Sequence, residues 1–470
     1  MSFPPIRSLS RWVLVLGSGL VLYFAPLPGF SPVQRHLAAI FVGTILALVA
    51  RPVAMGVSVM VAATVLMLTR TVPVEVVLSG FGNTTVWLMF SAFLFARAIT
   101  TTGLGVRIAY LFISRFGKTA LTLGYSVALS DLVLAPVVPS DTARGGGIMA
   151  PIVRNLAAAL DSEPGPTANR IGAYLTLVGF HCTYAASAMF LTGMAANPLI
   201  ASFASGIAHV DMTWGRWALA ALVPGLCTFA VIPWLIHELS PPDLRETEHA
   251  RAHARSRLRQ LGPMSGHERL LVGIMLLVMA GWITAPWHGI SNTVVALAGV
   301  CVILLSGVVS WDKLIGDTVA WDSLIWFALL LMMAEQLNDQ GVVGIISRTV
   351  FSHVHGWPWP LTLAALGIAY LYAHYSFASM TAHVSALYPG FLAASLAAGV
   401  PAPLAVWPLA FFSNLNAGIT HYGTGSAPIY FGSGYVSQGD WWTIGFIVSV
   451  VNIAIWFGVG LVWWRLIGLW

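Results

Sequence analysis

Two short segments of this chain repeat one arrangement of hydroxyl and basic side chains. The first reads Ser140-Asp141-Thr142-Ala143-Arg144, and the second, 239 positions later, reads Ser379-Met380-Thr381-Ala382-His383. An ionisable side chain inside an apolar membrane segment costs about 2.5 to 3.5 kcal/mol on insertion scales, so such residues tend to be functional. Two hydroxyls beside one cation are suitable partners for an anion. The repeated pattern therefore predicts a site that binds anions.

The composition of the chain indicates a membrane protein. Of its 470 residues 58% are hydrophobic and 8% are charged, whereas soluble domains carry about 25% charged residues. With a mean hydropathy of +0.82, the chain has too few polar side chains to cover a water-exposed surface. This predicts an all-α polytopic membrane protein. The formal charge of +5 is attributed mainly to loop arginines that orient the chain, and no nucleic-acid partner is expected.

The sequence favours neither a metal site nor an enzyme. The i, i+4 pair His249 and His253 in the polar break could hold a metal in principle, but it is interpreted as part of a solvated cytoplasmic helix. Cys182, Cys227 and Cys301 lie in apolar stretches, without the paired spacing of a disulfide framework or a zinc site. A membrane-embedded hydrolase is disfavoured because the chain contains neither a Gly-x-Ser-x-Gly elbow nor a His-Glu-x-x-His helix. We therefore expect no metal, no cofactor and no enzymatic activity.

Apolar stretches close to the roughly 20 residues that a helix needs to cross a bilayer recur along the chain. The first follows Arg7 and Arg11. Because no cleavage site is evident, it is interpreted as a transmembrane helix entering from the cytoplasm rather than as a signal peptide. The sequence predicts about eleven transmembrane helices, at 12–27, 34–50, 53–70, 83–102, 169–191, 215–238, 270–286, 291–309, 321–338, 404–421 and 441–466.

Two further apolar segments, about 118–156 and 358–398, each contain two apolar runs that meet at one of the repeated patterns. Non-helical backbone at membrane depth is tolerated only where it is buried in protein or lines a wet cavity. A helical hairpin that enters and leaves by the same face satisfies this condition. Pro139 helps to end the incoming helix, and Ser140 or Asp141 suits the N-cap of the outgoing one. We therefore predict two re-entrant hairpins with the patterns at their tips.

A polar, arginine-rich break divides the chain into similar parts. Residues 1–30 are expected to contain the first transmembrane helix and residues 31–239 the first repeat. Residues 240–269 are predicted to form a cytoplasmic linker, and residues 270–470 the second repeat.

Matched glycines support the repeat. Gly103 and Gly341 lie 238 positions apart, and the segments Gly193–Pro198 and Gly423–Pro428 share a Gly-x4-Pro spacing. Each half then contains five crossings, one hairpin and one interrupted helix. Because five is odd, the two repeats are expected to have opposite orientations in the membrane. An inverted-topology repeat with paired broken helices is typical of a secondary transporter whose site lies near the midplane.

Three runs of the sequence resemble a known family. Pro139–Gly147, Phe377–His383 and His421–Gly425 are similar to motifs of the divalent anion/sodium symporter family. The likeness extends from about residue 30 to the C-terminus and is greatest to the branch of 2-oxoglutarate/malate translocators and citrate/succinate antiporters. The resemblance implies a secondary active transporter of di- or tricarboxylates in the inner (plasma) membrane, with membrane lipids around it. It also implies a homodimer whose protomers each have a fixed scaffold and a moving, elevator-type transport domain.

The same resemblance implies a set of site residues. The hydroxyls of the two repeated patterns are the implied carboxylate contacts, and the two Gly-x4-Pro segments are the implied surroundings of the ions. The substrate-binding candidates are Ser140, Asp141, Thr142, Arg144, Ser379, Thr381, His383, Asn197 and Thr424, and the candidates for an ion or proton site are Asp141, Gly193, Gly423 and His421.

This chain departs from the family pattern at the centre of each motif, where Asp141 and Met380 replace asparagine. A thioether is a poor ligand for sodium, which is a hard cation. Arg144 and His383, four positions after each Ser, are expected to supply the counter-charge for a dianion instead. If these charges are permanent, the empty carrier holds uncompensated charge and resists the conformational switch, which favours a dicarboxylate antiporter. The alternative is a sodium- or proton-coupled dicarboxylate or sulfate symporter.

Asp141 has two interpretations that the sequence leaves open. In the first, it caps the outgoing helix and forms a salt bridge with Arg144. In the second, it binds a proton or a sodium ion.

Overall fold

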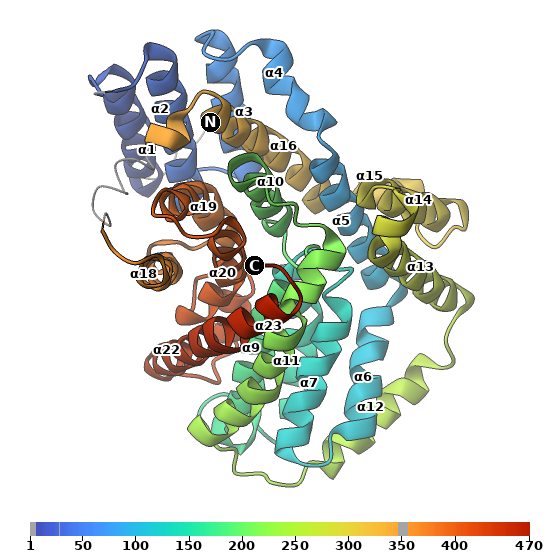
Figure 1. The fold of residues 1–470 in the computed structure, drawn as a ribbon. Helices are drawn as coiled ribbons and strands as arrows, with labels where there is room; N and C mark the ends of the chain where they lie inside the picture. The colour runs from blue at the N-terminus through green and yellow to red at the C-terminus, as the bar shows by residue number, and fades with distance from the viewer. Residues whose placement is uncertain (1–5, 28, 346–355) are drawn as a thin grey trace.

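The computed structural model describes residues 6–27, 29–345 and 356–470, which are almost wholly helical (Figure 1). Within these ranges the only β-type pairing is an isolated bridge between Thr119 and Glu246. A helix satisfies its own backbone hydrogen bonds, as a bilayer requires. Six helical stretches of the described chain are long and apolar enough to cross a membrane: Pro32–Ala50, Thr84–Thr102, Trp214–Leu239, Gly266–His288, Thr318–Asp339 and Gln438–Leu466. The all-α, multi-pass prediction is confirmed.

One group of helices, which we call the frame, lies along the top and right of Figure 1. In it α2 packs on α1 and α3, α16 packs on α3 and α5, and α14 packs on α5 and α13. The frame consists of α1 (Ile6–Phe24), α2 (Pro32–Ala50), α3 (Met55–Leu68), α4 (Val74–Ser79), α5 (Thr84–Thr102), α13 (Gly266–His288), α14 (Asn292–Leu305), α15 (Trp311–Ile315) and α16 (Thr318–Asp339).

The second group, which we call the core body, occupies the lower left of Figure 1. At its centre every residue of α9 is buried, and α9 packs on α7, α8, α11 and α20. The core body consists of α7 (Ala120–Leu134), α8 (Ala150–Ala159), α9 (Gly172–Met189), α10 (Asn197–Ala208), α11 (Trp214–Leu239), α18 (Trp359–Tyr372), α19 (Met380–Ala397), α20 (Ala402–Leu415), α21 (Ala427–Phe431), α22 (Gln438–Ala454) and α23 (Gly460–Leu466).

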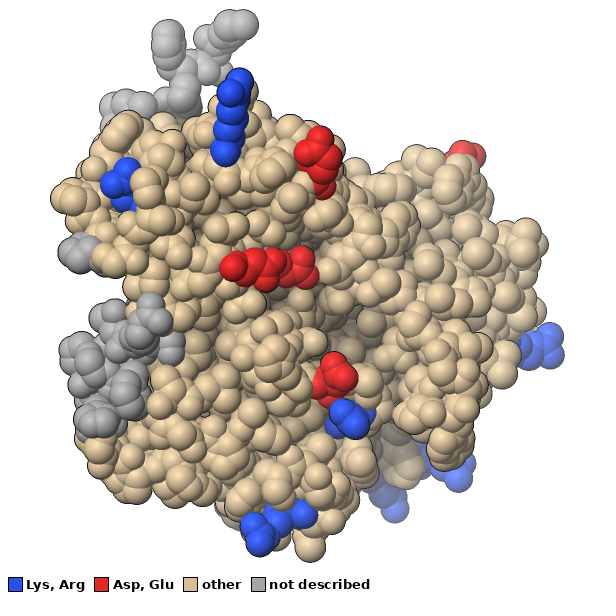
Figure 2. All heavy atoms as spheres, turned by 45° about the horizontal axis from the view of Figure 1, so that its top comes forward, with Lys and Arg blue, Asp and Glu red and all other residues tan. Residues whose placement is uncertain are grey.

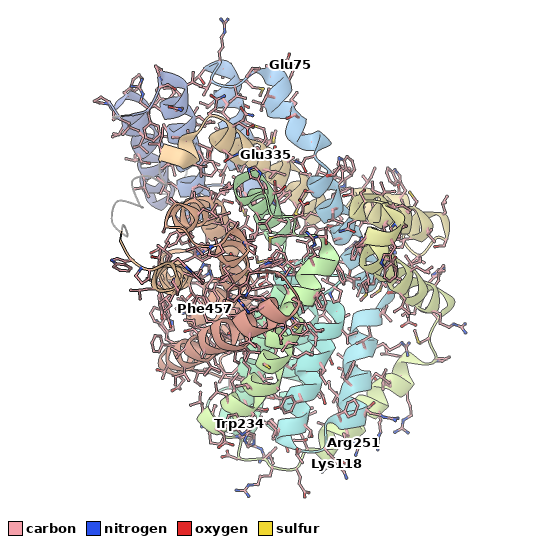
Figure 3. The ribbon with its side chains drawn as sticks, viewed as in Figure 1. Glu75, Lys118, Trp234, Arg251, Glu335 and Phe457 are labelled. Atoms are coloured by element: carbon pink, nitrogen blue, oxygen red, sulfur yellow. The ribbon has the colours of Figure 1, made fainter. Side chains whose placement is uncertain are left out.

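Two further helices, α6 (Leu104–Phe116) and α12 (Glu248–Leu261), pack on each other at the edge of the core body. Arg251 Nε donates to Ser114 O at 3.2 Å, which ties the polar helix α12 to α6. Figure 3 shows Lys118 and Arg251 at one end of the molecule and Glu75 at the opposite end. The predicted linker 240–269 thus contains the helix that its polar sequence led us to expect.

The order of helices repeats along the chain. α7 begins at Ala120 and α18 at Trp359, 239 positions later, while α9 begins at Gly172 and α20 at Ala402, 230 positions later. The offset of 239 positions equals that between the two repeated patterns. The offset of 230 positions equals that between the two Gly-x4-Pro segments. Gly103 and Gly341, with φ of 75° and 74°, both adopt the left-handed conformation that glycine accommodates without strain.

The outer surface suits a lipid environment. On the face drawn in Figure 2, charged side chains are few and most of the surface is uncharged. Large apolar side chains elsewhere on the frame are highly exposed, including Leu277 (74%) and Leu305 (89%). In water such a surface would be an aggregation hazard, whereas in a bilayer it contacts acyl chains.

Candidate functional site

Four segments of the core body form the candidate site. We call Ser140–Arg144 the first tip and Ser379–His383 the second tip. The first tip lies between α7 and α8 and the second between α18 and α19. We call Gly193–Pro198, between α9 and α10, the first break, and Gly423–Pro428, between α20 and α21, the second break.

The serine of each tip begins the outgoing helix. Ser140 Oγ accepts a hydrogen bond from the Ala143 N–H at 3.1 Å, and Ser379 Oγ accepts one from the Ala382 N–H at 3.3 Å. These contacts satisfy a backbone donor that would otherwise lack a partner at a helix N-terminus. In the first tip the helix continues as a wide π-helical turn, Thr142–Met149, a geometry frequent at functional sites.

The two tips also share one pattern of burial. The four hydroxyl-bearing residues are partly exposed, while the central residue and the basic residue of each tip are buried. The partly exposed residues are Ser140, Thr142, Ser379 and Thr381, and the buried ones are Asp141, Arg144, Met380 and His383. The hydroxyl-bearing residues are therefore the more accessible members of each tip.

Arg144 is fully buried and has a complete set of partners. Its Nε lies 3.0 Å from Asp131 Oδ1 on the incoming helix α7, forming a buried salt bridge. The prediction that Asp141 pairs with Arg144 is wrong, because Arg144 turns inward toward α7 and α9 instead. Its terminal nitrogens donate to Val138 O at 2.8 Å, Gly193 O at 3.1 Å, Thr183 O at 2.9 Å and Ser187 Oγ at 2.7 Å.

Asp141 connects the first tip to the second break, which comes from the other half of the chain. Its Oδ2 accepts hydrogen bonds from the hydroxyls of Thr424 and Ser426, the latter at 3.0 Å. Its side chain makes no cap hydrogen bond, so Ser140 is the cap. Gly425 lies so close to Thr142 that a side chain at 425 would collide with the Thr142 hydroxyl.

His383 is fully buried among aromatic rings. Its ring centroid lies 4.4 Å from that of Tyr370, 5.0 Å from that of His374 and 5.2 Å from that of Phe377. Neither ring nitrogen of His383 has a hydrogen-bond partner in the described chain. Nε2 of the neighbouring His374 lies 2.8 Å from Gly423 O, so the second break also contacts the segment that precedes the second tip.

The two breaks have the same close backbone turn. A Cβ at Gly193 would lie 2.7 Å from Ser187 O, and a Cβ at Gly423 would lie 2.8 Å from Ala417 O. Both distances are too short for a side chain, so glycine is required at each. Arg144 donates a hydrogen bond to the Gly193 carbonyl, and the His374 ring is hydrogen-bonded to the Gly423 carbonyl.

Asn197 and His421 lie away from the exposed hydroxyls. Asn197 is fully buried and closes the first break by donating to Ser187 O at 3.0 Å and Phe190 O at 2.9 Å. It also accepts from Asn414 at 2.9 Å. The structure therefore gives Asn197 a structural position rather than a ligand-facing one. His421 Nδ1 accepts from Trp442 Nε1 at 3.0 Å, toward α22 rather than the tips.

Comparison with known proteins identifies the family. The sodium:sulfate symporter transmembrane region family matches residues 7–470. The chain belongs to this family. The putative malate transporter YflS of Bacillus subtilis is 46% identical over 460 residues, which cover 97% of this chain and 96% of that protein. Chloroplastic dicarboxylate transporter 1 of Arabidopsis thaliana is 41% identical over 459 residues, covering 97% and 82% respectively.

A solved structure supports the fold independently. The YdaH transporter of Alcanivorax borkumensis matches with a TM-score of 0.55 over 99% of this chain and 98% of that one, at 16% sequence identity. This sodium:sulfate symporter family member is thus a multi-pass membrane transporter and not an enzyme.

Sequence reasoning missed several partners of the site residues in this family member. Asp131 is an acid within an apolar run, a signal that marks it as functional but does not name its partner. His374 is a single histidine in an apolar segment, which is a weak signal because such a histidine often only bonds a neighbouring helix. Ser187 and Ser426 carry no sequence signal at all, because a single hydroxyl in a membrane helix is common. Their roles come from the packing of α9 and the second break against the first tip.

Proposed function

We propose that this transporter exchanges dicarboxylates across the plasma membrane without cotransporting sodium. Two of its relatives are named as transporters of malate or dicarboxylates. In this proposal the partly exposed hydroxyls of Thr142 and Thr381, with Ser140 and Ser379, hold the carboxylates. Hydrogen bonds from hydroxyls to a charged group contribute about 1.5 to 3 kcal/mol each.

The observation that carries the proposal is the position of the Arg144 guanidinium. It donates to the carbonyl oxygens of Val138, Gly193 and Thr183, and oxygen ligands of this kind are what sodium, a hard cation, prefers. A tethered cation thus occupies the oxygen-rich surroundings that a cotransported cation would need. Because this cation cannot dissociate, it cannot link transport to an ion gradient.

The second tip also lacks the ligands of a sodium site. Met380 is buried at its centre and offers only a thioether. The matching position in the first tip, Asp141, has the hydroxyls of Thr424 and Ser426 as partners. By the offset of 230 positions, those two residues correspond to Met194 and Ala196, which bring no oxygen-bearing side chain.

Movement of the core body against the frame is part of the proposal. The two groups meet through limited packing, of α10 on α5 and α16, α19 on α2, and α11 on α13. Arg51 Nη2 at the end of α2 donates to Ala378 O at 2.9 Å, beside the second tip. Glu335 of α16, which lies beside α10 in Figure 3, accepts from Asn83 at 3.0 Å within the frame. An elevator-type shift in each protomer of a homodimer, with the repeats inverted, would break few contacts.

Counterflow in proteoliposomes tests the exchange. Vesicles are loaded with labelled malate in sodium-free buffer, and efflux is followed with and without external malate or succinate. We expect external dicarboxylate to accelerate efflux and a sodium gradient to have no effect. Net malate uptake into empty vesicles, driven by a sodium gradient, would instead establish the symporter. Sulfate added outside in place of dicarboxylate serves as the specificity control.

A further inference from the structure

The buried charges of the core body do not favour a dianion. Its acidic and basic residues (Asp, Glu, Lys, Arg and His) with less than one-tenth exposure, in the described chain, are Asp131, Asp141, Arg144 and three histidines. Asp131 is neutralised by Arg144, while Asp141 has hydroxyl partners and no basic one. With neutral histidines these groups sum to one negative charge. A dicarboxylate held between the tips therefore needs positive charge from another source.

Two of the three histidines stand together beside the second tip. The rings of His374 and His383 are 5.0 Å apart at an interplanar angle of 71°, and both side chains are fully buried. His374 Nδ1 and both nitrogens of His383 have no hydrogen-bond partner within the described ranges. Buried polar groups are rarely left in this state unless something else binds there.

Comparison of the two halves shows which residues of the first half lie at the positions that match these histidines. At an offset of 239 positions, Arg144 corresponds to His383, Asp131 to Tyr370, and Ala135 to His374. Where the first half has the Arg144–Asp131 ion pair, the second half has a ring contact between His383 and Tyr370. The Tyr370 hydroxyl is hydrogen-bonded to Ser413 Oγ at 2.7 Å. His374 contacts Gly423 O as Arg144 contacts Gly193 O. Together, two imidazole side chains stand where one guanidinium stands in the first half.

Within the part of the chain that the structure describes, few ionisable groups lie near this place. The titratable side chains that face His383 are Tyr370 on α18 and His374 just beyond it. The adjoining α10 and α20 contain no acid or base in their sequences. On α2 the nearest charged group is Arg51, which is exposed and bonded to the backbone of Ala378.

We propose that His374 and His383 form a shared proton site that is filled when a dicarboxylate binds at the tips. The inference rests on the proposed function. The proton comes from bulk water on the side of loading and returns to water when the anion leaves. Two adjacent imidazolium ions repel each other, so the pair takes up about one proton rather than two. In an exchange cycle, protons accompany the anions in both directions.

Proton uptake is measured by calorimetric titration of the purified full-length transporter with malate. The titration is repeated near neutral pH in two buffers that differ in ionisation enthalpy, and the difference in heat gives the number of protons bound. We expect uptake of about half to one proton per malate. Clear malate binding with heats that do not depend on the buffer overturns the proton site and leaves the proposed function intact. Absence of malate and succinate binding overturns both.

Variants then show which side chains bind the proton. His374→Gln and His383→Gln should each abolish the uptake. His181→Gln, a change of another fully buried histidine outside the site, should retain it. Uptake that persists in both site variants, or that is lost only in Asp141→Asn, overturns the assignment. Loss in only one of the two histidine variants overturns the sharing. The wild-type measurement remains decisive if a variant fails to fold.

Discussion

In the first tip Arg144 is buried beside Asp131, while in the second tip His383 is buried at the matching position beside Tyr370. An arginine is always charged, so its burial requires a permanent acid and several further acceptors, and Arg144 has all of these. A histidine can be buried neutral without an acid. The first half therefore holds a fixed charge, whereas the proposed proton site would give the second half a charge that varies with its occupant.

Removal of one member of the Arg144–Asp131 pair should have the largest effect. Arg144→Gln leaves Asp131 as a buried, unpaired charge, and Asp131→Asn does the same to Arg144, so each should lower stability by about 3 to 5 kcal/mol. The double variant should lose less than either single one because no charge remains. Melting temperatures in detergent, followed by tryptophan fluorescence, measure this. A wild-type melting temperature for both single variants would show that the pair is dispensable.

Converting the second tip into a copy of the first should have the next largest effect. His383→Arg alone places a guanidinium in an aromatic pocket without an acid, and we expect a loss of about 3 kcal/mol. Adding Tyr370→Asp supplies the missing partner and should restore part of that stability. The same melting experiment compares the single and double variants. No recovery in the double variant would mean that the two tips are not equivalent in geometry.

The two breaks should respond alike, because their turns are alike. Gly193→Ala and Gly423→Ala each force a Cβ to within 3 Å of a backbone oxygen, at 2.7 and 2.8 Å, and should cost about 1 to 3 kcal/mol. Gly147→Ala is the matched control, since its Cβ would approach nothing closer than 3.9 Å. Exchange rates and melting temperatures are compared for the three variants. Tolerance of alanine at either break contradicts the shared turn.

The hydroxyls of the two tips should show the smallest effect, confined to substrate affinity. Thr142→Ala and Thr381→Ala each remove one hydrogen bond to a carboxylate, so we expect about a tenfold rise in apparent KM with an unchanged melting temperature. Initial exchange rates over a range of external malate concentrations give KM. An unchanged KM in both variants would place the substrate elsewhere. A rise in only one would show that the tips contribute unequally.

Much of the fold follows from local features of the sequence. The apolar stretch expected at 34–50 is α2 (Pro32–Ala50), and the one expected at 215–238 is α11 (Trp214–Leu239). Hydropathy over about 20 residues determines such helices wherever the chain is placed in lipid. The short helix α10 gives no such signal because it has only 12 residues, whereas α12 was expected from the polar character of the linker.

The sequence by itself determined the two tips and the two breaks and narrowed the first cap to Ser140 or Asp141, because capping and close turns depend on neighbouring residues. Only the tertiary structure decided which groups meet. Arg144 and Asp131 are 13 positions apart, and Asp141 and Thr424 are 283 positions apart. Helix packing determines which residues at such separations come into contact. A buried charged side chain then pairs with an acid or a hydroxyl that this packing places next to it.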